Sequence, residues 1–239
     1  MGQRLSCRAG HENGFFRAIE LGELETLISL LETNPSLIHQ TSPHTRDSAL
    51  HFAAAHGHIE ILSLLLERYA INPDEANGKK QTPLMLAAMH GKISCVQKLV
   101  EVGANILLFD SVGRRTCLHY AAYYGHSDCL KAILSAAHSS PIAVSWGYAR
   151  FVNIRDGKGA TPLHLAARRR RAECVHILLQ NGALACASTC RYGFPGSTAL
   201  HLAARGGSLD CIRELLAWGA DRLHTDSAGY GHASHFFIS

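Results

Sequence analysis

The chain reads Thr161-Pro162-Leu163-His164-Leu165-Ala166-Ala167, and close variants of this heptapeptide occur four more times. The variants begin at Ser48, Thr82, Thr116 and Thr198. Successive copies start 34, 34, 45 and 37 residues apart. Five copies in register do not arise by chance, so the chain is built from internal repeats.

Each position of the heptapeptide has a physical role. The Thr or Ser hydroxyl can accept hydrogen bonds from free N–H groups at the start of a helix, and Pro fits the first helical turn. Leu faces the core, and the two Ala residues let neighbouring helices approach closely. A period near 33 with Thr-Pro-Leu-His-x-Ala is typical of ankyrin repeats, each a turn plus two helices. We therefore predict an all-α ankyrin-repeat solenoid of about six repeats, the first a degenerate copy that begins near Phe15.

A glycine follows nine residues after the start of four of the heptapeptides, where a left-handed residue can end the first helix of the repeat. These glycines are Gly57, Gly91, Gly125 and Gly207. In the remaining repeat the position holds Arg170. Placing a non-glycine residue in that conformation costs about 1 kcal/mol, unless this helix ends differently.

The pattern divides the chain into three parts. We predict an N-terminal tail over residues 1–13, a repeat domain over 14–229 and an atypical C-terminal tail over 230–239. Two connections exceed the repeat length, by about a dozen residues between Ser135 and Arg150 and by four residues near Cys190. Insertions in a solenoid often lie on the binding face.

Composition and charge favour a cytoplasmic protein. The 239 residues contain 23 Lys and Arg against 19 Asp and Glu, a net charge of +4 that is too small to indicate a nucleic-acid partner. No apolar run reaches the roughly 18 residues that a membrane-spanning helix needs, and the first residues lack the apolar stretch of a secretory signal. Scattered cysteines fit a reducing compartment.

The cysteines and histidines follow the repeat. Four cysteines recur thirteen residues after a heptapeptide start, and we interpret them as small buried apolar side chains. They are Cys95, Cys129, Cys174 and Cys211. The heptapeptide histidines are interpreted as hydrogen-bonding structural residues. Since Cys186 and Cys190 have no second ligand pair, and no catalytic motif is present, we predict no catalytic residue, metal or cofactor in this chain.

The two residues after each Ala pair are expected to line the concave side of the solenoid, where a protein partner would bind. The candidates are His56, Met89, His90, Tyr123, Tyr124, Arg168, Arg169 and Arg205. Trp146, in the longer insertion, is a further candidate. Tyr and Arg commonly dominate protein interfaces. Four interpretations of Arg168–Arg171 stay open: a solvated helix end, a site for an acidic partner segment, a nuclear import signal, or a contact with anionic lipid.

The first residues fit a lipidation signal. Met1-Gly2-Gln3-Arg4-Leu5-Ser6 matches the N-myristoylation pattern, with Gly2 as the acceptor. One myristoyl chain binds membranes weakly, and Cys7 could supply a second signal as a palmitoylation site. The pattern therefore predicts attachment to the inner leaflet, at the cytosolic face of the plasma membrane. The alternative is an ordinary N-terminal tail.

Longer stretches go beyond a general repeat consensus. They are Gln81-Thr-Pro-Leu-Met-Leu-Ala-Ala-Met-His-Gly-Lys-Ile-Ser-Cys95, Arg115-Thr-Cys-Leu-His-Tyr-Ala-Ala-Tyr-Tyr-Gly125 and Trp146-Gly-Tyr-Ala-Arg-Phe-Val-Asn-Ile-Arg-Asp156. Over about residues 1–229 the chain resembles the plant ankyrin-repeat RING-finger ubiquitin ligases. The resemblance implies a substrate-recruiting repeat array followed by a zinc-binding RING, with a receptor kinase among the partners.

The chain departs from that family near Tyr230. A RING needs paired Cys-x-x-Cys ligands, and this sequence contains none. We therefore expect a non-catalytic module that binds a protein partner or ubiquitination substrate on its concave face. Two alternatives stay open: a shortened gene model of an active RING E3 ubiquitin ligase, and a membrane-anchored regulatory scaffold unrelated to ubiquitin.

Overall fold

The computed structural model describes residues 14–139, 145–190 and 195–227. The chain divides into two compact units, the first ending at Ala104 and the second beginning at Asn105. The described residues contain no extended strand, only two isolated bridges, Thr41 with Ser48 and Ser188 with Thr198. This confirms the all-α prediction. The single repeat domain over residues 14–229 stays a prediction.

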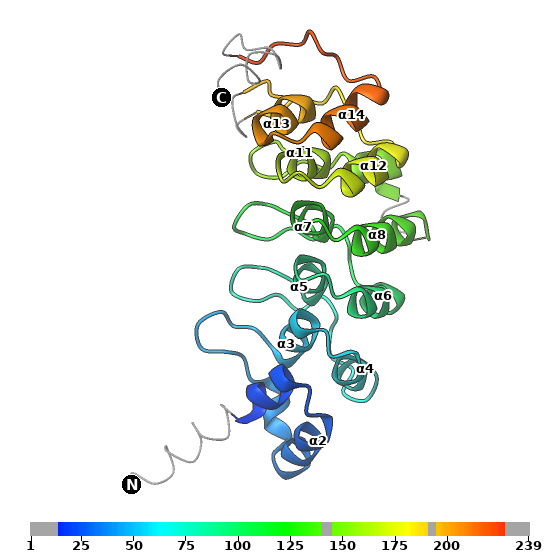
Figure 1. The fold of residues 1–239 in the computed structure, drawn as a ribbon. Helices are drawn as coiled ribbons and strands as arrows, with labels where there is room; N and C mark the ends of the chain where they lie inside the picture. Colours follow the sequence, from blue (N-terminus) through cyan, green and yellow to red (C-terminus); the bar gives the residue numbers. More distant parts are fainter. Residues whose placement is uncertain (1–13, 140–144, 191–194, 228–239) are drawn as a thin grey trace. The chain divides into compact units, whose positions relative to one another are not determined.

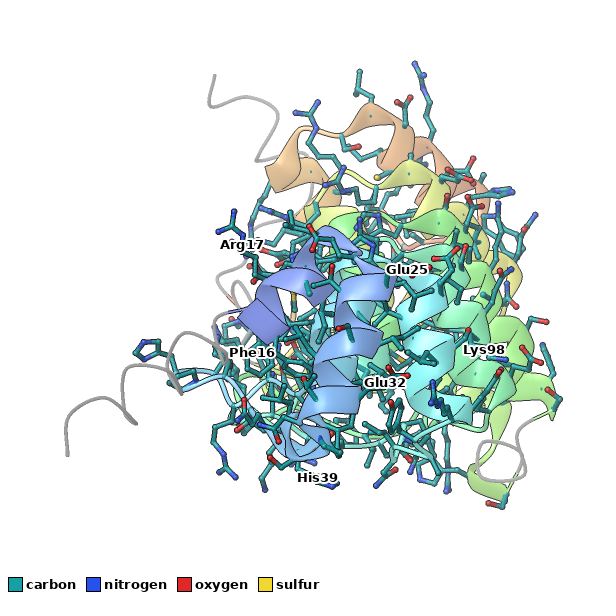
Figure 2. All side chains as sticks on the ribbon, turned by 90° about the horizontal axis from the view of Figure 1, so that it is seen from below. Phe16, Arg17, Glu25, Glu32, His39 and Lys98 are labelled. Atoms are coloured by element: carbon teal, nitrogen blue, oxygen red, sulfur yellow. The ribbon has the colours of Figure 1, made fainter. Side chains whose placement is uncertain are left out.

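The first unit consists of paired helices. After a helical segment at residues 14–21, the elements are Leu24–Thr33 (α2), Pro35–His39 (the 3-10 helix η1), Ala49–His56 (α3), Ile59–Glu67 (α4), Pro83–Met89 (α5) and Ile93–Glu101 (α6). The inner helices α3 and α5 pack side by side, and so do the outer helices α4 and α6 (Figure 1). Lys98, labelled in Figure 2, joins α6 to α4 through an ion pair of 2.7 Å between its Nζ and Glu67 Oε1.

The second unit repeats this two-layer arrangement. Its helices are Cys117–Tyr124 (α7), Ser127–Ser139 (α8), Tyr148–Val152 (α10), Pro162–Arg168 (α11), Ala172–Gln180 (α12), Ala199–Gly206 (α13) and Leu209–Ala217 (α14). The inner helix α11 packs between α7 and α13, and the outer helix α12 packs between α8 and α14 (Figure 1). A loop precedes each inner helix, and the loops before α7 and α11 are joined by a hydrogen bond of 2.7 Å from Gly157 N to Gly113 O.

The heptapeptide histidines lie in the first turn of the inner helices and bind the residue that caps each helix, which confirms their structural role. Nδ1 of His119 accepts the backbone N–H of Thr116 at 3.2 Å, and its Nε2 lies 3.3 Å from the carbonyl oxygen of Ala160 in the next repeat. His51 makes the same pair of contacts, to Ser48 N and to Gln81 O. Each of these buried side chains therefore caps its own helix and joins two repeats.

Left-handed residues end the inner helices as the sequence predicts. Gly57, Gly125 and Gly207 have φ of 89°, 87° and 67°. Arg170 adopts the same conformation, with φ of 61°. The repeat geometry therefore holds Arg170 in a conformation that is strained by about 1 kcal/mol.

The recurring cysteines are buried free thiols, as expected. Burial raises the pKa of Cys129 to about 11 and that of Cys174 to about 12. These thiols stay protonated at neutral pH and act as small packing groups.

Candidate partner-binding surface

Tyr123 is the centre of an aromatic and cationic cluster on the inner-helix side of the second unit. Its half-buried ring packs against Ala160, Leu165 and Leu202, so the ring is fixed by apolar contacts. Tyr124 meets it edge to face, with ring centroids 5.0 Å apart. The sequence-predicted pair is thus brought together at the end of α7.

Two guanidinium groups lie over the Tyr123 ring. The Cζ atom of Arg169 is 4.5 Å from the ring centroid, and that of Arg115 is 5.1 Å from it. A guanidinium within about 6 Å of a tyrosine ring is attracted to the electrons of the ring face. We call Arg115, Tyr123, Tyr124 and Arg169 the Tyr123 cluster.

The two arginines of the cluster differ in what else they contact. Arg115 is partly buried, and its Nε lies 3.5 Å from the buried carboxylate of Asp156 in the neighbouring loop. Arg169 is exposed, and its side chain makes no hydrogen bond or ion pair with the residues that the structure describes. Arg115 is therefore part of the scaffold, whereas Arg169 presents its N–H groups to solvent.

Arg168, Arg170 and Arg171 extend the positive charge of the cluster along the end of α11. All three side chains are exposed. The exposed carboxylate of Glu173 follows two residues after the run and lies 3.3 Å from Nζ of Lys131. The positive patch is thus confined to a short segment.

Arg205 holds the repeat position on α13 that Arg168 holds on α11. Its guanidinium, however, binds other side chains of this chain. Its guanidinium donates to the buried carboxylate of Asp226 and, at 3.1 Å, to the hydroxyl of Ser197. The structure therefore gives Arg205 a stabilising contact that the sequence pattern did not reveal.

The candidates of the first unit lie at the ends of α3 and α5. His56 is exposed, donates from Nδ1 to the carbonyl oxygen of Phe52 at 3.0 Å, and stacks on the Phe52 ring. His90 is exposed and Met89 is half-buried. Phe16, labelled in Figure 2, continues this row with its ring 4.8 Å from that of Phe52. This surface is aromatic and lacks the arginine run of the second unit.

The longer insertion lies beside the outer helices of the second unit. α10 packs on α8, where the rings of Tyr148 and His138 stack at 3.9 Å. The Tyr148 hydroxyl donates to Asn181 Oδ1 at the end of α12, at 2.6 Å. Trp146 is 38% exposed there. The structure therefore does not bring Trp146 together with the Tyr123 cluster, and residues 140–144 of the insertion lie outside the described segments.

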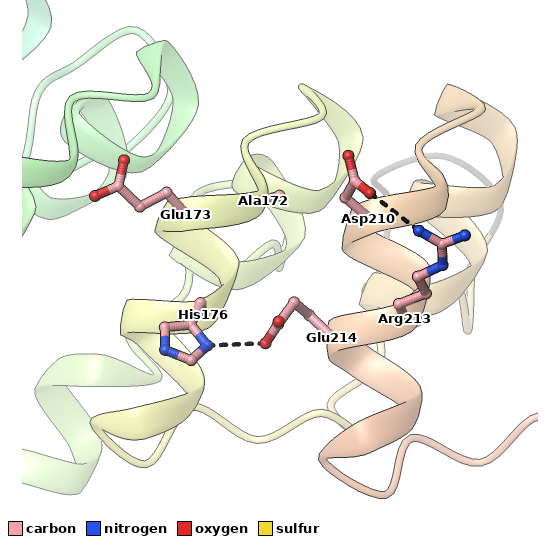
Figure 3. A pocket seen from close by; sticks show the side chains of 6 residues that line it. All are labelled: Ala172, Glu173, His176, Asp210, Arg213 and Glu214. Carbon is pink, nitrogen blue, oxygen red and sulfur yellow. Dashed lines mark hydrogen bonds and ion pairs between the residues drawn. The ribbon is translucent and has the colours of Figure 1, made fainter.

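A shallow pocket of about 410 Å³ lies between the outer helices α12 and α14. Figure 3 shows His176 facing Glu214 across it, with Nδ1 and Oε2 2.9 Å apart, and Arg213 beside Asp210 on α14. Within the described segments, no three His, Cys, Asp or Glu side chains are grouped so that they could hold a metal ion. None of the described helices has the length and apolar character needed to cross a membrane.

A family model described as ankyrin repeats (3 copies) matches residues 15–110, 70–141 and 118–226. The chain belongs to the ankyrin-repeat family. Its fold is also similar to the human ASB11 ankyrin repeat domain, with a TM-score of 0.71, 26% sequence identity, and coverage of 91% of this chain and 89% of the other.

The ankyrin repeats are homologous to those of plant E3 ubiquitin-protein ligases. The chain is 69% identical over 229 residues to the putative E3 ubiquitin-protein ligase XBAT31 of Arabidopsis thaliana, covering 96% of this chain and 50% of the relative. It is 64% identical over 230 residues to the E3 ubiquitin-protein ligase XB3 of rice, Oryza sativa subsp. japonica, covering 96% of this chain and 51% of that one. The chain therefore spans about half the length of these curated relatives.

Sequence reasoning missed Arg115 as a member of the cluster. Arg115 directly precedes Thr116, a place that Gln81, Ala160 and Ser197 occupy in other ankyrin repeats. The sequence did contain a signal for this contact: an arginine stands directly before a heptapeptide that is followed by two tyrosines. Only the fold shows that the loop before α7 and the end of the same helix meet.

Proposed function

We propose that this chain is the substrate-recruiting part of a plant RING-type E3 ubiquitin ligase. The 69% identity to a putative E3 ubiquitin-protein ligase over nearly the whole chain carries the proposal. Ankyrin repeats bind protein partners on an extended surface, and the Tyr123 cluster offers the Tyr and Arg side chains that commonly dominate such interfaces. The remaining half of a longer ligase would supply the RING and ubiquitin transfer.

The partner surface is proposed to lie on the inner-helix side of the second unit, with Tyr123, Tyr124, Arg168 and Arg169 at its centre. The partner is a ubiquitination substrate in the cytoplasm, and the resemblance to the plant ligases suggests a receptor kinase. Arg205 supports this surface by stabilising α13 and does not contact the partner directly, because its guanidinium donates to Asp226.

A reconstituted ubiquitin-transfer assay tests this function. The chain alone is expected to form no zinc-dependent ubiquitin chains with any conjugating enzyme, since its sequence has no Cys-x-x-Cys ligand pairs. A chimera that continues this chain with the second half of the Arabidopsis relative is expected to ubiquitinate proteins that the isolated chain captures from plant extract. A chimera that modifies itself but none of the captured proteins would contradict the proposal.

We further propose that the protein is held at the cytosolic face of the plasma membrane by lipids on Gly2 and Cys7. Both residues lie outside the described segments, and the support is the Met-Gly-x-x-x-Ser pattern. Gly2→Ala is expected to move the protein in plant cells from the membrane to the soluble fraction, and Cys7→Ser to do so partially, because one acyl chain alone binds reversibly. Ser6→Thr, which preserves the pattern, is the matched control. Wild-type protein found entirely in the soluble fraction would show that the lipid proposal is wrong.

A further inference from the structure

Arg169 is oriented before any partner arrives. Its guanidinium lies over the Tyr123 ring at 4.5 Å, and apolar packing on Ala160, Leu165 and Leu202 holds that ring in place. An arginine that is already held loses less conformational freedom when it binds a ligand. The geometry is therefore that of a prepared binding group rather than of a freely moving surface side chain.

The hydrogen-bond donors of the Arg169 side chain meet no acceptor in the described segments, in contrast to those of Arg115, Arg155 and Arg205. Arg155 donates to the carbonyl oxygens of Gly159 and Ser188, at 2.8 and 2.7 Å. Arg115 contacts Asp156, and Arg205 contacts Asp226. Within the described segments, the guanidinium of Arg169 has only the tyrosine ring as a partner.

The tyrosine hydroxyls beside Arg169 are also available. Neither Tyr123 nor Tyr124 makes a hydrogen bond through its hydroxyl to the described part of the chain. A planar guanidinium presents two parallel N–H groups that match both oxygens of a carboxylate, and nearby hydroxyls can donate further hydrogen bonds. Two carboxylates of the preceding loops are already engaged, because Asp156 is buried against Arg115 and Asp110 accepts from the Tyr120 hydroxyl.

We propose that Arg169, together with Tyr123 and Tyr124, binds an Asp or Glu side chain in an acidic segment of the partner protein. This proposal rests on the proposed recruiting function and specifies the chemistry that it recognises. Arg170 and Arg171 lie beside the cluster and attract the neighbouring negative charges of such a segment. A peptide suits this surface better than a bilayer does, because the patch is short, it ends at the exposed Glu173, and the whole chain carries a net charge of only +4.

Selection from a random peptide library displayed on phage tests the proposal. The immobilised wild-type chain is expected to enrich peptides that carry at least two Asp or Glu residues, and Arg169→Gln is expected to weaken their binding at least tenfold. Arg213→Gln is the matched control, since it removes the same charge from an exposed arginine on the outer helix α14. Its affinities are expected to stay within twofold of wild type. Arg169→Lys, which keeps the charge but lacks the planar pair of donors, is expected to bind several-fold more weakly.

Three results would overturn the proposal. They are selection without enrichment of acidic residues, equal losses in Arg169→Gln and Arg213→Gln, and binding to phosphatidylserine vesicles that depends on Arg169 while no acidic peptide is selected. The last result would assign the arginines to a lipid surface. If the chimera still ubiquitinates its captured partner while no acidic peptide is selected, only the inference about Arg169 is wrong. If the chimera also fails, the recruiting function is wrong as well.

Discussion

Replacing Arg205 with alanine is expected to lower the free energy of unfolding of the second unit by about 3 kcal/mol. The Asp226 side chain is 0% exposed and that of Arg205 is 19% exposed, so their ion pair lies in a region where water screens little. Removing one partner of a buried pair leaves the other charge uncompensated and costs about 3–5 kcal/mol. The lower end applies because Arg205 retains some contact with solvent.

Urea unfolding followed by circular dichroism measures this loss. Arg213→Ala is the control, because the side chains of its pair with Asp210 are 77% and 76% exposed and such surface pairs contribute about 0–1 kcal/mol. Adding Asp226→Asn to Arg205→Ala removes the orphaned charge and should recover part of the stability. Equal unfolding midpoints for Arg205→Ala and Arg213→Ala would show that the buried pair contributes nothing.

Lowering the pH from 7 to 5 is expected to destabilise the second unit by about 4 kcal/mol through His119 and His164. Burial lowers the pKa of each histidine from 6.5 to about 4. Between pH 6.5 and pH 4 these histidines bind protons in the unfolded chain but not in the folded chain. Their contribution to the free energy of unfolding is therefore fully present above pH 6.5. It decreases as the pH falls and is lost completely only near pH 4. Each histidine contributes a slope of about 1.4 kcal/mol per pH unit in this window.

The capping geometry gives the physical reason. Nδ1 of His164 accepts the backbone N–H of Thr161 at 3.2 Å, so a proton on Nδ1 would place two donors face to face. The amide oxygen of His164→Asn can accept the same N–H group but does not titrate. Unfolding free energies measured from pH 5 to 6.5 should therefore depend on pH less steeply in this variant. The difference in slope should correspond to about one fewer proton taken up on unfolding. His176→Asn, on an outer helix, is the control, and identical slopes for wild type and His164→Asn would contradict the account.

The sequence predicted the repeated elements because each is determined locally. The Thr or Ser cap, the Leu, the Ala pair and the closing glycine all act within one helix or its immediate neighbour. Even the exception at Arg170 followed the rule, since its φ of 61° matches the glycines at the same place. The heptapeptide histidines and the recurring cysteines could be assigned for the same reason.

The sequence could not predict the partners that individual arginines find. Arg205 looked like Arg168 because each directly follows an Ala pair, yet Arg205 meets the buried carboxylate of Asp226, in the loop after α14. That loop has no periodic pattern, so nothing marked Asp226 as the partner. The insertion with Trp146 was expected at the binding face on general grounds, and its packing on α8 and against Asn181 depends on Tyr148 and His138, which no repeat position specifies.

Our central proposal is that the inner-helix side of the second unit selects the protein that a ligase containing this chain would modify. The most direct measurement compares ubiquitination of the captured partner by the chimera with and without alanine at Tyr123, Tyr124, Arg168 and Arg169. Because truncating an interface hot spot costs about 2 kcal/mol or more, the account predicts at least a thirtyfold loss of partner ubiquitination with unchanged self-ubiquitination and unchanged helical circular dichroism. Partner ubiquitination at the wild-type rate in the fourfold variant would contradict it.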